Sequence, residues 1–180
     1  MFTSLRRKKS ESETARRLYA QVVTAARSPS FYTDGGVPDT VDGRFEMLVL
    51  HTYLVVGRLM SGSDVSKRIA QYLFDTMITD MDRSLREMGI GDLSVGKKVK
   101  AMAEAYYGRS QAYDAALEAD EVQLADAIRR NVFGTLAADG NSQISIVTGM
   151  VRYIQSTIGN LEKQSIDALT QGQIQFVEYT

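Results

Sequence analysis

Apolar side chains recur at intervals of three and four residues along most of this chain, and prolines occur only at positions 29 and 38. This spacing places apolar residues on one face of an α-helix, and helices tolerate few prolines. A chain of 180 residues is long enough for one domain with a sizeable core. The sequence therefore predicts an all-α, single-domain bundle of about six to seven helices.

Start and stop signals divide this pattern into separate helices. Ser10 and Glu13 have the spacing of a capping box, so a first helix is expected from Ser10 to about Arg27, before Pro29. Both prolines and three glycines fall within Ser28–Gly43, which indicates a loop of ordered turns. Further helices are expected over about Arg44–Met60, Ser63–Met88, Val95–Glu118, Glu121–Ala137 and Ser142–Ile158, with a short one after Asn160.

Two of these helices have informative apolar patterns. The helix Arg44–Met60 is apolar nearly all round, which predicts a central place in the bundle. The helix Ser63–Met88 carries a single apolar stripe, and Gly89 follows it where a left-handed C-cap is expected. The stripe consists of Ile69, Leu73, Met77, Met81, Leu85 and Met88.

The two ends of the chain differ from the helical domain expected over residues 11–170. Residues 1–10 form a basic N-terminal segment, and residues 171–180 an extended tail that is expected to dock through its aromatic side chains. Arg6, Arg7, Lys8 and Lys9 indicate either a frayed terminus or contact with an anionic membrane surface. A peripheral membrane-binding module is therefore one alternative for the whole chain.

Several kinds of functional site are excluded by missing residue types. The chain has no cysteine, which excludes disulfides and thiolate chemistry, and its single histidine excludes metal centres that need two imidazoles. That histidine, His51, lies in the most apolar helix, where a hydrogen-bonded core role is the simpler interpretation. With 21 basic and 22 acidic residues, no nucleic-acid partner is expected. We predict no catalytic residue, no metal site and no cofactor.

Three aspartates leave one enzymatic alternative open. Asp75, Asp80 and Asp82 could hold Mg²⁺ in an all-helical enzyme of the prenyl-transfer type, where carboxylates clamp a diphosphate through metal ions. Their spacing is poor for that purpose, and no second acidic cluster faces them. The simpler interpretation is a solvated ladder of ion pairs, each worth about 0.2–0.5 kcal/mol.

Short motifs follow one another in a specific order between about Leu18 and Gly134. They are Phe31-Tyr32, Gly36-Val37-Pro38-Asp39-Thr40, Gly43-Arg44-Phe45-Glu46, Leu73-Phe74-Asp75, Asp80-Met81-Asp82, Leu85 to Asp92, Tyr107-Gly108-Arg109 with Ala112-Tyr113, and Arg130-Asn131. In combination, these motifs resemble the ubiquinol–cytochrome c chaperone family, the assembly factors of respiratory complex III.

The resemblance implies a helical, non-enzymatic chaperone without a cofactor. Its client would be newly made cytochrome b, a membrane protein, and its place the cytoplasm, peripherally at the cytoplasmic face of the inner membrane. Such a chaperone needs an adaptable groove with an apolar floor and a polar rim, and the eight methionines suit the floor.

The rim is predicted from the polar residues of the motifs. We expect Tyr107 and Arg109 to touch the client, because tyrosine and arginine are enriched at binding hot spots. Arg44, Glu46, Asp80 and Arg86 could instead pair with one another inside the bundle. The full predicted rim is Arg44, Glu46, Asp80, Asp82, Arg83, Arg86, Glu87, Tyr107, Arg109, Arg130 and Asn131.

Overall fold

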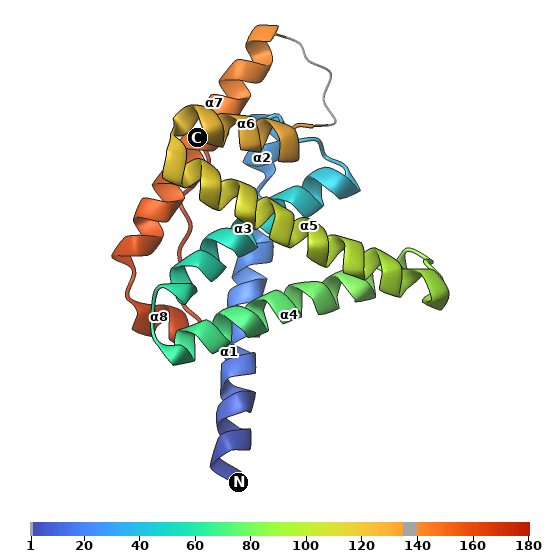
Figure 1. Cartoon of the computed structure of the whole chain (residues 1–180), viewed down its shortest axis with the longest axis vertical. Coiled ribbons are helices and arrows are strands. Elements are labelled where there is room, and N and C mark those ends of the chain that lie inside the picture. The colour runs from blue at the N-terminus through green and yellow to red at the C-terminus, as the bar shows by residue number, and fades with distance from the viewer. Residues whose placement is uncertain (1, 135–139) are drawn as a thin grey trace.

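A computed structural model describes residues 2–134 and 140–180 and confirms the all-α prediction (Figure 1). Within those residues six long helices and two five-residue helices occur, and no strand is present. The long helices are α1 (Phe2–Ala26), α3 (Val41–Met60), α4 (Asp64–Glu87), α5 (Asp92–Ala119), α6 (Glu121–Asn131) and α7 (Gly140–Lys163). The short helices are α2 (Pro29–Thr33) and α8 (Ile166–Thr170).

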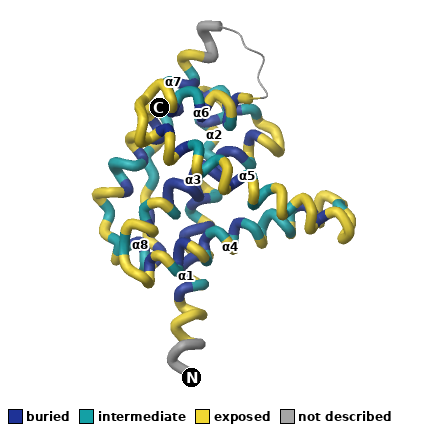
Figure 2. The backbone as a smooth tube through the Cα atoms, viewed as in Figure 1, coloured by how far each residue is buried: buried dark blue, intermediate teal, exposed yellow. Residues whose placement is uncertain are grey.

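Helix α3 lies at the centre of the bundle, as its apolar sequence predicts. It contacts α1, α4, α5, α7 and α8, and its residues from Glu46 to Val55 are buried without interruption (Figure 2). Thr40 begins the helix by accepting a hydrogen bond from the backbone nitrogen of Gly43. A helix surrounded on all sides must be apolar on all sides, which explains this composition.

Helices α4 and α5 form an antiparallel pair whose connected ends project from the body, and we call this projection the arm (Figure 1). The apolar stripe of α4 therefore changes environment along its length. Leu73 and Met77 are fully buried, Met81 is half-buried, and Met88 is 54% exposed. The stripe is continuous in sequence, but the body of the bundle covers only its first part.

The C-terminal tail packs against the bundle through its aromatic side chains. The Tyr179 ring lies 5.1 Å from Phe31 and 5.9 Å from Tyr153, and Phe176 lies 5.3 Å from His51. Phe31 belongs to α2, a short helix within the segment for which the sequence predicts only turns. Burial of Phe31 stabilises this helix, which is too short to be stable through backbone hydrogen bonds alone.

Three predicted helix ends differ from the structure. Helix α1 begins at Phe2 and passes through Ser10, because the preceding leucine, arginines and lysines are good helix formers. Helix α6 ends at Asn131, shortly before Gly134, where a Cβ atom would approach the Arg130 carbonyl oxygen to 2.3 Å. Residues 135–137 of the predicted helix lie outside the described residues. Helix α7 continues past the expected break at Asn160 to Lys163.

The arm turns through a Schellman motif at Gly89, as expected. Gly89 has φ of +83°, its nitrogen donates to the Arg86 carbonyl at 2.9 Å, and the Ile90 nitrogen donates to the Leu85 carbonyl at 3.0 Å. The N-cap of α5 is Gly91, without a side-chain hydrogen bond, although Asp92 and Ser94 nearby are residue types that often cap helices. Backbone geometry rather than side-chain capping therefore fixes the turn.

Replacing Gly89 by alanine should lower the free energy of unfolding by about 1 kcal/mol, because alanine is strained at positive φ. Chemical denaturation measures this change. Gly96 is the matched control: it lies within helix α5 with open space around its Cβ position, so Gly96→Ala should be neutral or stabilising. Equal losses for the two variants would contradict the assignment of the turn to Gly89.

Candidate functional site

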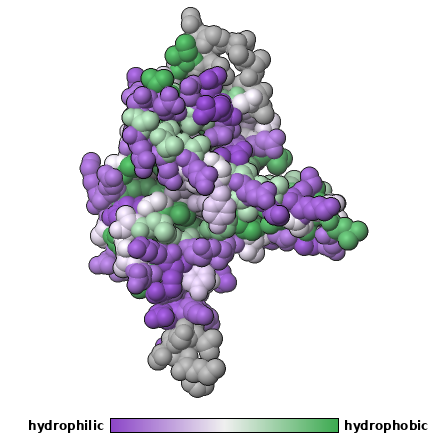
Figure 3. Space-filling view, in the orientation of Figure 1, coloured by the Kyte–Doolittle hydropathy of each residue, from purple (hydrophilic) through white to green (hydrophobic). Residues whose placement is uncertain are grey.

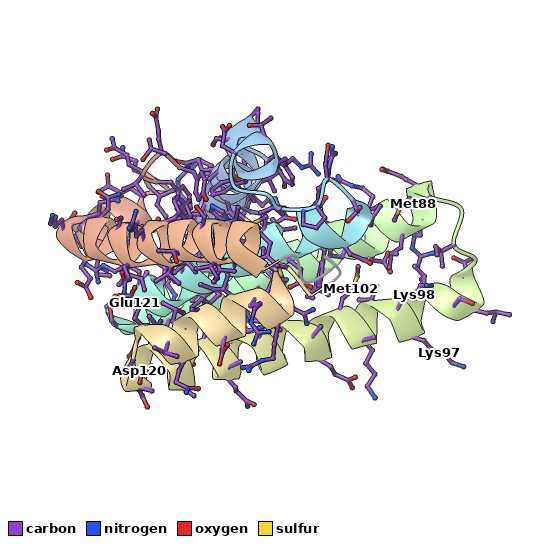
Figure 4. All side chains as sticks on the ribbon, turned by 90° about the horizontal axis from the view of Figure 1, so that it is seen from above. Met88, Lys97, Lys98, Met102, Asp120 and Glu121 are labelled. Atoms are coloured by element: carbon purple, nitrogen blue, oxygen red, sulfur yellow. The ribbon has the colours of Figure 1, made fainter. Side chains whose placement is uncertain are left out.

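An apolar groove of about 160 Å³ lies between α1, α3, α4 and α5 and extends from the body along the arm as far as Met88, next to the turn. Met81, Met88 and Met102 line it, and Met88 and Met102 lie on the two helices of the arm beside the N-terminal end of α3 (Figure 4). We call it the methionine groove. Its lining is Val23, Ala26, Arg27, Val41, Arg44, Phe45, Leu48, Met81, Ser84, Leu85, Met88 and Met102.

The side chains that line the methionine groove are suited to binding an apolar segment of another protein. Methionine side chains are unbranched and polarisable, so they repack against partners of varied shape. Arg27 and Arg44 supply positive charge at the edge. Arg44 donates to Asp39 at 2.6 Å, and both side chains of this ion pair are 57% exposed. The floor is apolar and the edge is polar.

Glu46 and Arg109, two of the predicted rim residues, form an ion pair that links α3 to α5. The guanidinium of Arg109 donates to both carboxylate oxygens of Glu46 and lies 5.8 Å from the centre of the Phe45 ring. The Glu46 side chain is 9% exposed, and burial raises its pKa while the bonds from Arg109 oppose that rise. Arg109 thus has a structural partner inside the bundle.

Asp80 faces α1 rather than the methionine groove. Its carboxylate accepts a hydrogen bond from the Tyr19 hydroxyl at 2.8 Å and pairs with Arg83 on the same helix. Burial, and then the neighbouring Asp80, raise the pKa of Tyr19. The hydrogen bond between Tyr19 and Asp80 therefore links the middle of α4 to α1.

The other charged rim residues on α4 lie along the arm. Asp82 accepts from Arg86 at 2.6 Å, and Arg86 also pairs with Asp92 at the start of α5. Arg83 reaches Glu87 at 3.8 Å. Arg44, Glu46, Asp80 and Arg86 each have a partner outside this set of four, so the alternative that they pair with one another is wrong.

The remaining predicted residues are Tyr107 on α5 and Arg130 and Asn131 on α6. Tyr107 is 53% exposed, and its ring lies 5.1 Å from Phe74 and 5.7 Å from Tyr106, so it is supported yet available to a partner. Arg130 and Asn131 end α6, away from the methionine groove. The structure therefore does not gather all rim residues around one opening.

The carboxylates of the enzymatic alternative do not converge. Asp75 accepts from Gln71 at 2.8 Å, whereas Asp80 and Asp82 have the partners described above. Among the residues that the structure describes, no group of three or more histidine, aspartate or glutamate side chains is placed to hold a metal ion. The geometry gives the Mg²⁺ alternative no support.

A second apolar hollow, of about 320 Å³, lies between α3, α5 and α7. Leu54, Leu117 and Ile158 are among its lining residues. Arg58 lines it too, but its guanidinium already donates to the carbonyl oxygens of Leu161 at 2.8 Å and Gln164 at 2.7 Å. No methionine lines this hollow, whereas three line the methionine groove.

Two buried polar residues have hydrogen-bond partners that the sequence does not indicate, although the hydrogen-bonded core role expected for His51 is confirmed. Glu11 is 4% exposed, and its carboxylate accepts three hydrogen bonds from the Arg68 guanidinium, at 2.7, 3.0 and 3.2 Å, which lower its pKa. His51 is fully buried; its Nδ1 donates to the Met47 carbonyl, and its Nε2 accepts from the Tyr153 hydroxyl, each at 2.7 Å. Glu11 and Arg68 lie 57 positions apart in the sequence, and His51 and Tyr153 lie 102 positions apart, so only folding brings these residues together.

Comparison with known proteins identifies the family. The model of the ubiquinol–cytochrome C chaperone family matches residues 33–176, most of the chain. This protein belongs to that family. The crystal structure of the Cbp3 homolog from Brucella abortus superposes with a TM-score of 0.83 at 36% identity, over 99% of this chain and 98% of that one.

Relatives of this family occur in eukaryotes. Ubiquinol-cytochrome-c reductase complex assembly factor 1 of Xenopus laevis is 25% identical over 69% of this chain and 62% of its own length. Protein CBP3, mitochondrial, of Saccharomyces cerevisiae is 28% identical over 82% of this chain and 44% of its own length. The chain thus spans about half the length of such relatives. In the described part of this family member, no helix is both long and apolar enough to cross a bilayer.

Proposed function

We propose that this protein is a non-enzymatic assembly chaperone that binds newly made cytochrome b and promotes assembly of ubiquinol–cytochrome c oxidoreductase. Membership of the chaperone family supports the role in assembly. The binding site is inferred from the methionine groove, an apolar, methionine-lined surface that runs from the body along the arm.

The client segment would lie against Met81, Met88 and Met102. An apolar helix of a membrane protein presents side chains of varied shape, and flexible methionines can repack around each of them. Ionic contacts at the exposed edge would be weak individually, so most of the affinity would come from burial of apolar area. Arg44, which lines the exposed edge of the groove, is the predicted rim residue placed to extend this contact.

Photo-crosslinking tests the site directly. A benzoylphenylalanine at Met88 should form a crosslink with cytochrome b in intact cells, and the same group at Val122 should not. Val122 is a fair control because it is exposed (67%, against 54% for Met88) but lies on α6. Equal labelling from both positions would contradict the proposal.

A loss-of-function variant tests the same site by another route. Met88→Glu combined with Met102→Glu should lower cytochrome b crosslinking and complex III content about tenfold, because carboxylates under an apolar segment lose their hydration. Leu117→Glu places a carboxylate in the second apolar hollow and should leave both readouts unchanged. Normal complex III in the double variant, with an unchanged thermal unfolding curve, would overturn the assignment of the methionine groove.

A further inference from the structure

The end of the arm carries an apolar residue that the fold leaves uncovered. Leu93, in the first turn of α5, is 95% exposed, and Met88 beside the turn is 54% exposed. Apolar surface shows at the end of the arm in the space-filling view (Figure 3). We define the arm tip as residues 88–100. A leucine exposed to this degree contributes almost nothing to the stability of its own chain.

Leu93 is not needed to hold the arm tip together. Leu85 on α4 and Val95 on α5 are buried, at 6% and 2% exposure, and they lie apart from the main core. The Schellman turn at Gly89 closes the connection between the helices. The arm tip therefore has its own packing and turn, and Leu93 points away from both.

Several basic residues lie near this leucine in the sequence. Between Arg86 and Lys100 the sequence contains four basic and two acidic residues. Asp92, beside Leu93, is paired with Arg86, which offsets its charge. Lys97 and Lys98 are exposed and form no ion pair within residues 2–134 and 140–180 (Figure 4). An exposed leucine with unpaired lysines one turn away is complementary to an anionic lipid surface.

The shape of the arm tip also favours a lipid surface over a protein. A stable protein–protein interface buries about 800 Å² on each partner, whereas this projection offers one leucine and one partly exposed methionine. Lipid headgroups rearrange around a convex projection, so a small apolar tip can still bury its area. The basic N-terminal residues Arg6–Lys9, exposed on the projecting end of α1, offer a second, purely electrostatic contact (Figure 1).

We propose that the arm tip docks this protein on an anionic bilayer, with Leu93 inserted at the boundary of headgroups and acyl chains and Lys97 and Lys98 against the phosphates. The inference goes beyond cytochrome b binding and does not depend on it. If the proposed function also holds, docking places the methionine groove, which runs along the same arm as far as Met88, close to the surface from which membrane-protein segments emerge.

Vesicle co-sedimentation tests the proposal with the full-length chain alone. Wild type should bind phosphatidylcholine vesicles containing about one third phosphatidylglycerol and bind pure phosphatidylcholine weakly. Leu93→Asp should lower partitioning about tenfold or more, and Lys97→Ala with Lys98→Ala about 30-fold at low salt. Val122→Asp, at another exposed apolar position, should bind like wild type.

A fluorescence measurement separates the arm tip from the N-terminal basic residues. The chain has no tryptophan, so Leu93→Trp introduces a single reporter whose emission should shift to the blue on anionic vesicles. Val122→Trp should show no shift. Unchanged emission of the Leu93→Trp variant, or full binding by Leu93→Asp, overturns the proposal. Binding that disappears only when Arg6–Lys9 are replaced by alanine would assign the contact to α1 and also overturn it.

Discussion

Replacing Arg109 by alanine is expected to destabilise the protein by about 3 kcal/mol, a large share of the stability of a domain of this size. The variant leaves the Glu46 carboxylate, 9% exposed, buried without its cation. Breaking a buried ion pair by removing one partner is costly because the remaining charge is desolvated. Urea unfolding at neutral pH measures the change.

The exposed pair Arg44–Asp39 provides the matched control. Both of its side chains are 57% exposed, so Arg44→Ala should cost no more than about 0.5 kcal/mol. The loss from Arg109→Ala should also shrink as the pH falls, because protonation of Glu46 removes the unpaired charge. A loss for Arg109→Ala as small as that for Arg44→Ala would contradict a structural role for the buried pair.

Because loss of Arg109 destabilises the fold, it also affects how the predicted contact of Tyr107 and Arg109 with a client can be tested. A double alanine variant would lose complex III through misfolding even if neither residue touches cytochrome b. Tyr107→Ala is the cleaner test, because the exposed Tyr107 ring leaves no buried charge behind when it is removed. The client contact of Arg109 itself stays a prediction.

Acid is expected to destabilise the protein through His51. Burial lowers the pKa of this fully buried imidazole from 6.5 to about 4, because the protonated form would be desolvated. Between these values the unfolded chain binds a proton that the folded protein does not, so stability is complete above pH 6.5 and falls as the pH decreases towards 4. At about 1.4 kcal/mol per pH unit, the loss reaches roughly 3 kcal/mol.

The measurement compares unfolding free energies of wild type and His51→Gln across this pH range. Glu46 has a raised pKa and acts with the opposite sign, so the difference between the two proteins isolates the histidine. Because the chain has one histidine, its imidazole proton resonance can also be followed directly by NMR. An imidazole that titrates near pH 6.5 in the folded protein would contradict its burial against Tyr153 and Phe31.

Much of the fold follows from local patterns in the sequence. Three- and four-residue spacing predicts the long helices, and the all-round apolar character of residues 44–60 predicts that α3 is central. Gly89 predicts the Schellman turn. Helix ends are less well predicted, because a capping-box spacing such as that at Ser10, or an asparagine such as Asn160, also occurs within helices that packing holds together.

The family, too, could be inferred from the ordered motifs between Leu18 and Gly134, and the family model confirms it. The motifs mix residues of different roles, however. Glu46 and Arg109 belong to separate motifs and meet across α3 and α5 as a buried pair, whereas Tyr107, two residues from Arg109, is exposed. Sequence proximity does not show which of the two lies at the surface.

The sequence by itself thus determined the helices, the apolar stripe of α4 and the family, since these depend on neighbours along the chain. The tertiary structure alone decided where the stripe stops being core. Met77 is buried under the body, whereas Met88, on the same stripe, is 54% exposed and lines the methionine groove near the end of the arm. The physical reason is that burial depends on what packs against a face: α1 crosses α4 instead of running along it, so the body covers only part of its length (Figure 1).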